Sequence, residues 1–104
     1  MKTLRIHALA SREAAEEAAY YESKRQGWGR RFLAQLNATY DSIIEYPAAP
    51  TPIDGTPYRK LRVRGFPNAV IYRVLEAEIR VMAVANLYRE PGYWTGRRFS
   101  DENE

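Results

Sequence analysis

The sequence predicts one α+β domain with the element order β-α-α-β-β-β, in which a helical hairpin packs on one face of an antiparallel sheet. Two apolar, β-branched runs, Ala69–Leu75 and Ile79–Ala85, are separated by a short polar link, which is typical of a β-hairpin. Apolar residues between Arg30 and Tyr46 recur at spacings of three and four, which indicates an amphipathic helix. The chain has 104 residues, the length of a single domain.

The N-terminal part predicts a short strand and a first helix. Leu4–Leu9 alternates apolar and polar residues, as a strand does. Ser11 is then expected as the N-cap of a helix that runs to about Gln26, with Gly27 at the C′ position. The expected apolar face of this helix consists mainly of small side chains, which suit close packing on another helix. It consists of Ala14, Ala15, Ala18, Ala19 and Tyr21.

A second helix follows a Gly-Trp-Gly link. It is expected to begin after Gly29 and to run from Arg30 to Tyr46, where Pro47 ends it. The two helices then form an antiparallel hairpin, with Trp28 packed in the turn. The segment from Pro47 to Pro57 is rich in proline and predicts a stiff loop within the domain.

From Tyr58 the pattern changes to a period of two. Leu61 and Val63 are expected on one face of a strand, and the cations of that strand on the other. The last three strands should form an antiparallel meander with the Phe66–Trp94 region at its centre. The sheet face away from the helices is expected to be free and to carry part of the cationic set. The domain is expected to span 1–98, with a polar tail at 99–104.

The charge distribution points to an anionic partner. The net charge is +3, and the region 58–98 holds nine lysines and arginines against three glutamates. A localised cationic surface favours a polyanion or an acidic protein, whereas the simpler alternative is a solvated face that confers solubility.

Several function classes lack their residues. The chain has no cysteine and a single histidine, so it predicts no disulfide framework, no metal site and no cofactor. No Gly-rich phosphate loop and no membrane-spanning apolar run are present, which leads us to expect a soluble cytoplasmic protein. His7 is expected at the surface. The acidic residues of the first helix are expected on a solvated face; they are Glu13, Glu16, Glu17 and Glu22.

The cations are therefore the candidates for function. Lys60, Arg62 and Arg64 share one strand face at intervals of about 7 Å, which is close to the phosphate spacing of a nucleic-acid strand. Arg73, Arg80 and Arg89 follow on later elements, and an arginine fork suits phosphate or carboxylate. Tyr88, Tyr93 and Trp94 could stack on bases. Alternatively, Tyr93 and Trp94 plug the underside of the sheet, and the arginines are paired with Glu76, Glu78 and Glu90.

These residues carry a resemblance to a known superfamily. The relevant segments run in order through the chain: Ala18–Glu22, Gly27–Phe32, Pro47, Phe66-Pro67 with Val70–Val74, Val81–Ala85, Arg89–Trp94 and Arg97. Together they resemble the RelE/ParE superfamily of toxins from bacterial type II toxin–antitoxin systems, and the Arg-x-Pro-x-Tyr-Trp ending is nearer the ParE-like branch.

The resemblance implies a growth-inhibiting toxin that a cognate antitoxin neutralises in a hetero-oligomer. ParE-like members inhibit DNA gyrase without cutting RNA. RelE-like members cut mRNA in the ribosomal A site, and a degenerate toxin that only binds its antitoxin is a third alternative. Candidate residues for binding the antitoxin or the target are Arg59, Lys60, Arg62, Arg64, Arg73, Arg89, Tyr93 and Trp94. Candidates for RNA cleavage are Lys60, Arg62, Arg64, Arg73, Arg80, Arg89 and Tyr93.

The chain departs from the superfamily at two positions. Asn68 stands where members often have tyrosine after Phe-Pro, and Asn86 stands where they often have histidine at the end of the last strand. Asparagine cannot exchange a proton near neutral pH, whereas histidine can. The departures therefore argue against acid–base chemistry at these positions.

Overall fold

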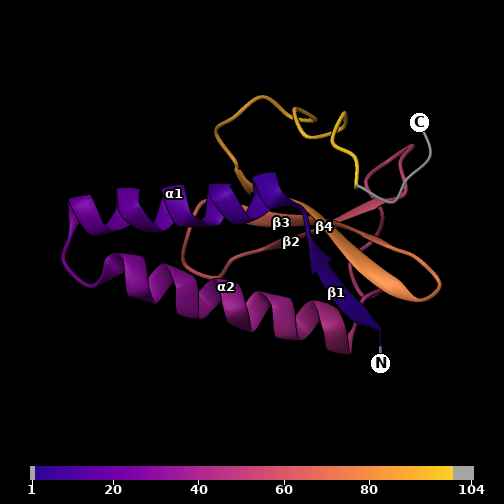
Figure 1. Cartoon of the computed structure of the whole chain (residues 1–104), viewed down its shortest axis with the longest axis horizontal. Helices are drawn as coiled ribbons and strands as arrows, with labels where there is room; N and C mark the ends of the chain where they lie inside the picture. Colours follow the sequence, from indigo (N-terminus) through magenta and orange to yellow (C-terminus); the bar gives the residue numbers. More distant parts are fainter. Residues whose placement is uncertain (1, 100–104) are drawn as a thin grey trace.

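The computed structural model describes residues 2–99 and has the predicted element order (Figure 1). Its elements are β1 (Thr3–Ile6), α1 (Ala8–Lys24), α2 (Trp28–Glu45), β2 (Tyr58–Arg62), β3 (Asn68–Val74) and β4 (Glu78–Asn86). The α+β prediction is confirmed, because the helical hairpin packs on one face of a four-stranded sheet. No helix in the range 2–99 is long and apolar enough to cross a membrane.

The sheet has the strand order β1-β4-β3-β2, so the β3–β4 hairpin is central, as predicted. Strands β2, β3 and β4 form the expected antiparallel meander. Strand β1 instead pairs parallel to β4, with Leu4 opposite Ile79 and Ile6 opposite Val81. The sheet is therefore mixed, and the expectation of a wholly antiparallel sheet is wrong at this edge.

The ends of α1 differ from the sequence-based prediction. The helix begins at Ala8 because the Nδ1 atom of His7 accepts a hydrogen bond from the N–H of Leu9 at 3.0 Å. Ser11 consequently lies inside the helix and is not its N-cap. Gly27 does adopt a left-handed backbone, with a φ of 88°, but it is the N-cap of α2 and not the C′ residue of α1.

The turn of the helical hairpin is held by Glu22 and requires a glycine at position 29. The Glu22 carboxylate accepts hydrogen bonds from the N–H groups of Gly27 and Gly29, and these bonds lower the pKa of Glu22. A Cβ atom on Gly29 would lie 2.6 Å from the carbonyl oxygen of Ala18. Glycine at this position therefore permits the close approach of the two helices.

The main core lies between the helices and the sheet. Its aromatic centre is the trio Tyr21, Phe32 and Phe66, whose ring centroids are 4.9–5.2 Å apart. The sheet contributes one face of β3 and β4, including Val70, Tyr72, Ile79, Val81 and Val84, and the residues alternate except where the register irregularity separates Val81 from Val84. This alternation is the pattern expected of a strand that has one face on the core.

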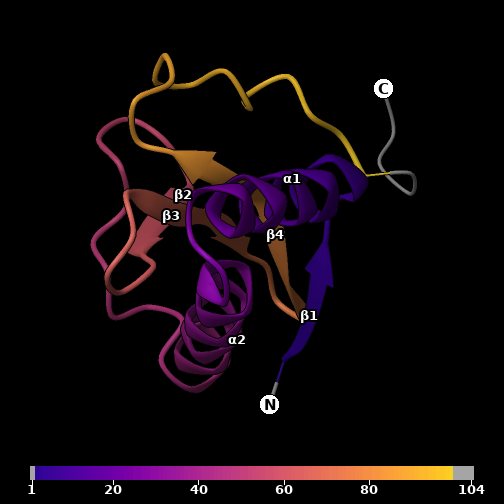
Figure 2. The same cartoon turned by 90° about the vertical axis from the view of Figure 1, so that its left-hand side faces the viewer.

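The buried stripe of α1 differs from the predicted one. Ala15 and Ala19 are exposed, whereas Glu13 is buried. The helix is turned so that this stripe faces β4 as well as α2 (Figure 2). The residues at this interface are Ala10, Glu13, Ala14, Ala18 and Tyr21.

The second face of the sheet is not free, contrary to the prediction. The segment after β4, residues 87–99, turns back over it and ends beside the start of α1 (Figure 2). Trp94 and Phe99 are buried there against a small cluster of sheet residues, Ile71, Met82, Ala83 and Ala85. Phe99 therefore belongs to the packed domain and not to the expected tail at 99–104, of which residues 100–104 lie outside the described residues.

Candidate functional site

The candidate site forms where β4 extends beyond its short partner β1. The register of β1 on β4 ends at Ile6 opposite Val81. The register of β3 on β4 is irregular just beyond this point, because Tyr72 is opposite Val81 whereas Ile71 is opposite Ala83. The carbonyl of Met82 and the N–H of Val84 flank Ala83. If β1 continued as a parallel strand, these are the two groups that would form hydrogen bonds with it.

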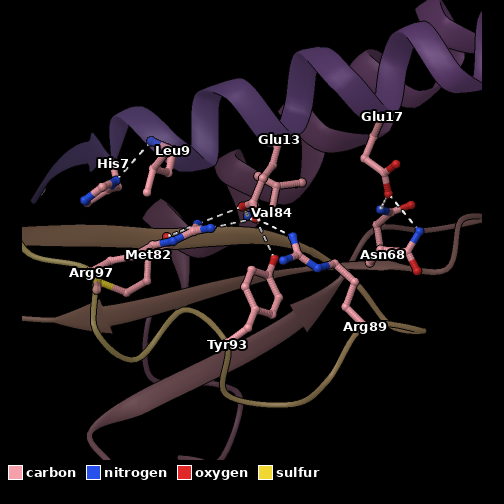
Figure 3. Close-up of polar contacts among 11 residues, drawn as sticks. His7, Leu9, Glu13, Glu17, Asn68, Met82, Val84, Arg89, Tyr93 and Arg97 are labelled. Atoms are coloured by element: carbon pink, nitrogen blue, oxygen red, sulfur yellow. Dashed lines mark hydrogen bonds and ion pairs between the residues drawn. The ribbon is translucent and has the colours of Figure 1, made fainter.

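Two side chains occupy the place of that missing strand (Figure 3). The Glu13 carboxylate accepts a hydrogen bond from the N–H of Val84 at 3.0 Å, and the Arg97 guanidinium donates to the carbonyl of Met82 at 3.0 Å. Glu13 and Arg97 also bind each other through two hydrogen bonds of 2.8 and 2.9 Å. Because unpaired backbone groups are unfavourable when buried, this ion pair completes the sheet edge.

Glu13 is the centre of a larger cluster. Its Oε2 atom accepts hydrogen bonds from the hydroxyl of Tyr93 at 2.7 Å and from Arg89 at 3.3 Å (Figure 3). The guanidinium of Arg89 also lies 3.7 Å from the centre of the Tyr93 ring, which is a cation–π contact. One carboxylate of α1 thus holds three side chains of the segment 87–99.

The protonation states of this cluster follow from the contacts. Burial by itself raises the pKa of Glu13, but the hydrogen bonds from Arg97, Tyr93 and the Val84 N–H outweigh it and lower the pKa. Burial, followed by the hydrogen bond to Glu13, raises the pKa of Tyr93. Tyr93 is therefore a protonated donor near neutral pH, and Glu13 is a carboxylate engaged by its neighbours.

A second polar cluster lies one turn further along α1. The Oε1 atom of Glu17 accepts hydrogen bonds from the side-chain amides of Asn68 and Asn86, at 2.5 and 2.9 Å. These two asparagines are opposite each other in the β3–β4 register, and Tyr21 donates its hydroxyl hydrogen bond to Asn68. Burial, and then the charge of Glu17, raises the pKa of Tyr21 to about 12. Asn68 and Asn86 thus bind one carboxylate.

Two hollows adjoin the first cluster at Arg89. One has a volume of about 180 Å³ and lies between the glutamates of α1, Asn86 and Arg89. The other has a volume of about 400 Å³ and lies between the segment after β4 and the strand β2, with Lys60, Arg89, Tyr93 and Trp94 in its wall. Arg89 lines both hollows.

The predicted site residues fall into separate groups. Arg89, Tyr93 and Lys60 lie around the larger hollow. Arg59 donates hydrogen bonds to the carbonyls of Ala48 and Pro50 and so fixes the proline-rich loop. Arg62 donates to the carbonyl of Phe66 at 3.2 Å in the β2–β3 turn.

The other predicted residues lie elsewhere. Arg64 is exposed beside a different hollow, next to Trp28 and Phe66. Arg73 and Arg80 line a further hollow nearer the start of β4, which Arg97 of the first cluster also lines. Trp94 is 6% exposed, with its ring against Tyr58 at 4.8 Å between centroids, so it packs under the sheet as the alternative interpretation expected.

Glu13, Glu17 and Arg97 were missed as candidates from the sequence. The glutamates were assigned to a solvated face, yet Glu13 accepts hydrogen bonds from three side chains. A usable signal existed: Glu13 and Glu17 lie three and seven residues after Ala10, on the same helical stripe. The excess of arginines after β4 was the complementary signal.

The chemistry available to the first cluster is recognition more than proton transfer. Glu13 and Tyr93 are bound to each other, and the raised pKa of Tyr93 disfavours it as a base. Among residues 2–99 no group of His, Asp or Glu side chains is arranged to hold a metal ion. The exposed part of Arg89, whose side chain is 53% accessible, is the charge that the cluster presents at the surface.

Comparison with known proteins connects this fold to one solved system. No protein-family model and no curated protein sequence matches the chain. Solved structures do match, and one is a chain of "Chromosomal ParDE TA system from P. aeruginosa". The TM-score is 0.73 at 14% sequence identity, over 84% of this chain and 97% of that chain. The two chains therefore share a fold.

Proposed function

We propose that this chain is the toxin component of a type II toxin–antitoxin module, which acts by binding DNA gyrase and is neutralised by a cognate antitoxin. The observation that carries the proposal is the shared fold with a ParDE chain, nearly all of which is covered by the match. The sequence motifs that resemble the ParE-like branch run through the same elements and support it independently.

The cluster at Glu13 favours binding over RNA cleavage. Cleavage needs a base for the 2′-hydroxyl and a donor for the leaving oxygen. Tyr93 is held as a donor to Glu13, and Asn86 occupies the position where a histidine would be expected. The strongest features that remain are a half-exposed arginine and a largely apolar hollow, which together suit a protein partner.

We place the target-binding or antitoxin-binding surface around Arg89, with Lys60 and Tyr93 at its sides. Arg89 is oriented by Glu13 and by the ring of Tyr93 while much of its side chain stays accessible. An oriented arginine loses little side-chain freedom on binding, which favours affinity.

Two assays test the target. The purified protein is added to a gyrase supercoiling reaction and, separately, to a translation reaction with a defined mRNA. We expect inhibition of supercoiling and intact mRNA. Codon-positioned cuts that require ribosomes would overturn the gyrase proposal in favour of a RelE-like ribonuclease.

Growth on induction in bacterial cells tests toxicity itself. We expect arrest, and its relief when the small protein encoded by the adjacent reading frame is expressed together with this chain and copurifies with it. The variant Arg89→Gln should relieve the arrest, whereas the matched control Arg12→Gln, at an exposed position of α1, should not. Normal growth with the unaltered chain would instead indicate a degenerate toxin.

A further inference from the structure

Three arginines stand side by side in one row across the sheet. Arg73 of β3 is opposite Arg80 of β4, and Arg80 is opposite Arg5 of β1. Tyr58 of β2 is opposite Arg73 and extends the row to the other edge. Like charges directly opposite each other destabilise a sheet, so this row needs compensation.

The compensation is uneven along the row. Glu78 accepts from Arg5 at 3.2 Å and from Arg80 at 2.5 Å. The ring of Phe99 lies 5.1 Å from the guanidinium of Arg5 and 5.0 Å from that of Arg80. Arg73 is half-buried, and within residues 2–99 its guanidinium forms no hydrogen bond or ion pair. Of the three charges in the row, that of Arg73 is thus the one without an acidic partner among residues 2–99.

Two more arginines enclose the same place. Arg97 and Arg98 come from the segment after β4 and, with Arg73, Arg80 and Tyr58, line a hollow of about 230 Å³. The binding of Glu13 shows what such a set does: two arginines and one tyrosine hold a single carboxylate there. The hollow repeats the set of residue types, with Arg73, Arg80 and Tyr58.

We propose that this hollow is a carboxylate-binding pocket that receives an aspartate or glutamate side chain from an acidic segment of a protein partner. The inference rests on the proposed function in one respect: in a toxin–antitoxin pair the partner is the antitoxin. The pocket adds an anchor nearer the start of β4 than Arg89 is, and a carboxylate in it neutralises the like-charge row.

The size of the hollow favours a carboxylate over a nucleic-acid strand. A polyanion binds best along an open, continuous cationic groove. Here Thr95, Gly96 and Met82 complete the lining of a hollow of about 230 Å³, which suits one small group. Glu78, beside the row, already binds Arg5 and Arg80, so the row is not a continuous cationic groove. Arginine forks around a small space match the two oxygens of a carboxylate.

The test uses a blocked tetraglutamate peptide as the probe, with inorganic phosphate and an oligouridylate of equal charge as competitors. Binding to the full-length protein is followed by NMR of the arginine side chains. We expect the peptide to shift the Arg73 signal, and Arg73→Gln to weaken its binding about tenfold, as loss of a charge-assisted hydrogen bond does. The matched control Arg12→Gln should bind as the unaltered protein does.

A second readout separates a binding role from a structural one. Because Arg73 is repelled by its neighbour in the row, Arg73→Gln should raise the melting temperature of the free protein by about 2–4 °C. A lower melting temperature would mean that Arg73 stabilises the fold, and would overturn the proposal.

The remaining outcomes each overturn the proposal in a distinct way. Peptide binding that appears only after removal of residues 100–104 would assign the pocket to the acidic end of this chain. Tighter binding of the oligouridylate at Arg73 would assign it to nucleic acid, and equal binding by Arg73→Gln would remove the pocket altogether. The growth and supercoiling assays are independent of all three, so failure of the proposed function is recognised separately.

Discussion

The two faces of the sheet are held in different ways. On the helix face, Tyr21, Phe32 and Phe66 form one continuous apolar core under two regular helices. On the other face, a segment without helix or strand, residues 87–99, covers a smaller cluster and is fixed by the polar contacts of Glu13. Apolar packing stabilises the fold as a whole, whereas the polar contacts fix the position of one segment.

The contrast also separates stability from recognition. The helix face is formed by buried apolar and aromatic residues that stabilise the fold by packing, and no cationic side chain lies in its core. The cations gather on the second face, where Lys60, Arg73 and Arg89 lie around two hollows. Changes on the first face should unfold the protein, and changes on the second should mainly alter what it binds.

The largest effect is expected for Phe32→Ala. Phe32 is fully buried and contacts the rings of Tyr21 and Phe66, so its truncation leaves a cavity in the main core. We expect a loss of about 3–5 kcal/mol in the free energy of unfolding, measured by urea denaturation. Phe32→Leu is the conservative control and should lose less. A loss below about 1 kcal/mol would contradict a core centred on this ring.

A smaller and more local effect is expected for Glu13→Gln. Glutamine keeps the shape but removes the charge that Arg97 and Arg89 bind, which should destabilise the protein by about 2–3 kcal/mol. In a Trp28→Phe background the fluorescence of Trp94 reports on the segment 87–99. We expect this signal to change at lower urea than the helical circular dichroism.

The exposed neighbour Glu16 supplies the control for that experiment. Glu16→Gln should change the free energy of unfolding by less than about 0.5 kcal/mol. If the Trp94 fluorescence and the circular dichroism change together in Glu13→Gln, the two faces unfold as one unit and the comparison fails.

Acid should loosen the second face, and alkali the helix face. The lowered pKa of Glu13 means that its stabilisation is complete above the unfolded value near 4.5 and is lost as pH falls through the folded pKa. Burial raises the pKa of Tyr40 to about 12, and the pKa of Tyr21 is raised to a similar value. Their stabilisation is present below about pH 10, the usual tyrosine pKa, and is lost as pH rises above it.

The acid part of the pH profile can be tested with the variant Glu13→Gln. Protonated Glu13 resembles glutamine, so acid can do no more at this site than Glu13→Gln does. Trp94 fluorescence between pH 6 and 3 should show an acid transition that is reduced in Glu13→Gln. An unchanged acid transition in this variant would assign it to other carboxylates.

The smallest effect on stability is expected for Arg89→Gln. The Arg89 side chain is 53% exposed, and its ion pair with Glu13 is 3.3 Å long, so the loss should be about 0.5 kcal/mol. Its effect on growth arrest should nevertheless be large. A variant that melts like the unaltered protein but no longer arrests growth would show that the second face carries the function, whereas a variant that still arrests growth would not.

The regular elements could be predicted from periodicity, and the closure of the second face could not. The apolar spacing after Arg30 and the alternation after Tyr58 identified α2 and β2 because each pattern is local. Glu13 was misassigned because its partner Arg97 is 84 residues away, and no local pattern encodes that contact. The parallel pairing of β1 is non-local in the same sense.

The types of residue in the candidate site could be predicted from the sequence, but which of them lie together could not. Arginines after β4 were expected to matter, yet only the structure joins Arg89 to Glu13 and Arg73 to Arg98. The burial of Trp94 was one of the two interpretations of the sequence, but the prediction that the face is free failed because the segment 87–99 has no periodic pattern to reveal its path over the sheet.

The contact between Glu13 and Arg97 also has a consequence for the timing of folding during synthesis. A ribosome exposes the N-terminal helices first, and these can already pack on each other while the rest of the chain is being made. The groups that occupy the open edge of β4 include Arg97, which is synthesised after all the helices and strands. Nascent chains therefore acquire the complete second face only after Arg97 has left the ribosome, so a polypeptide that stops before Arg97 does not yet display it.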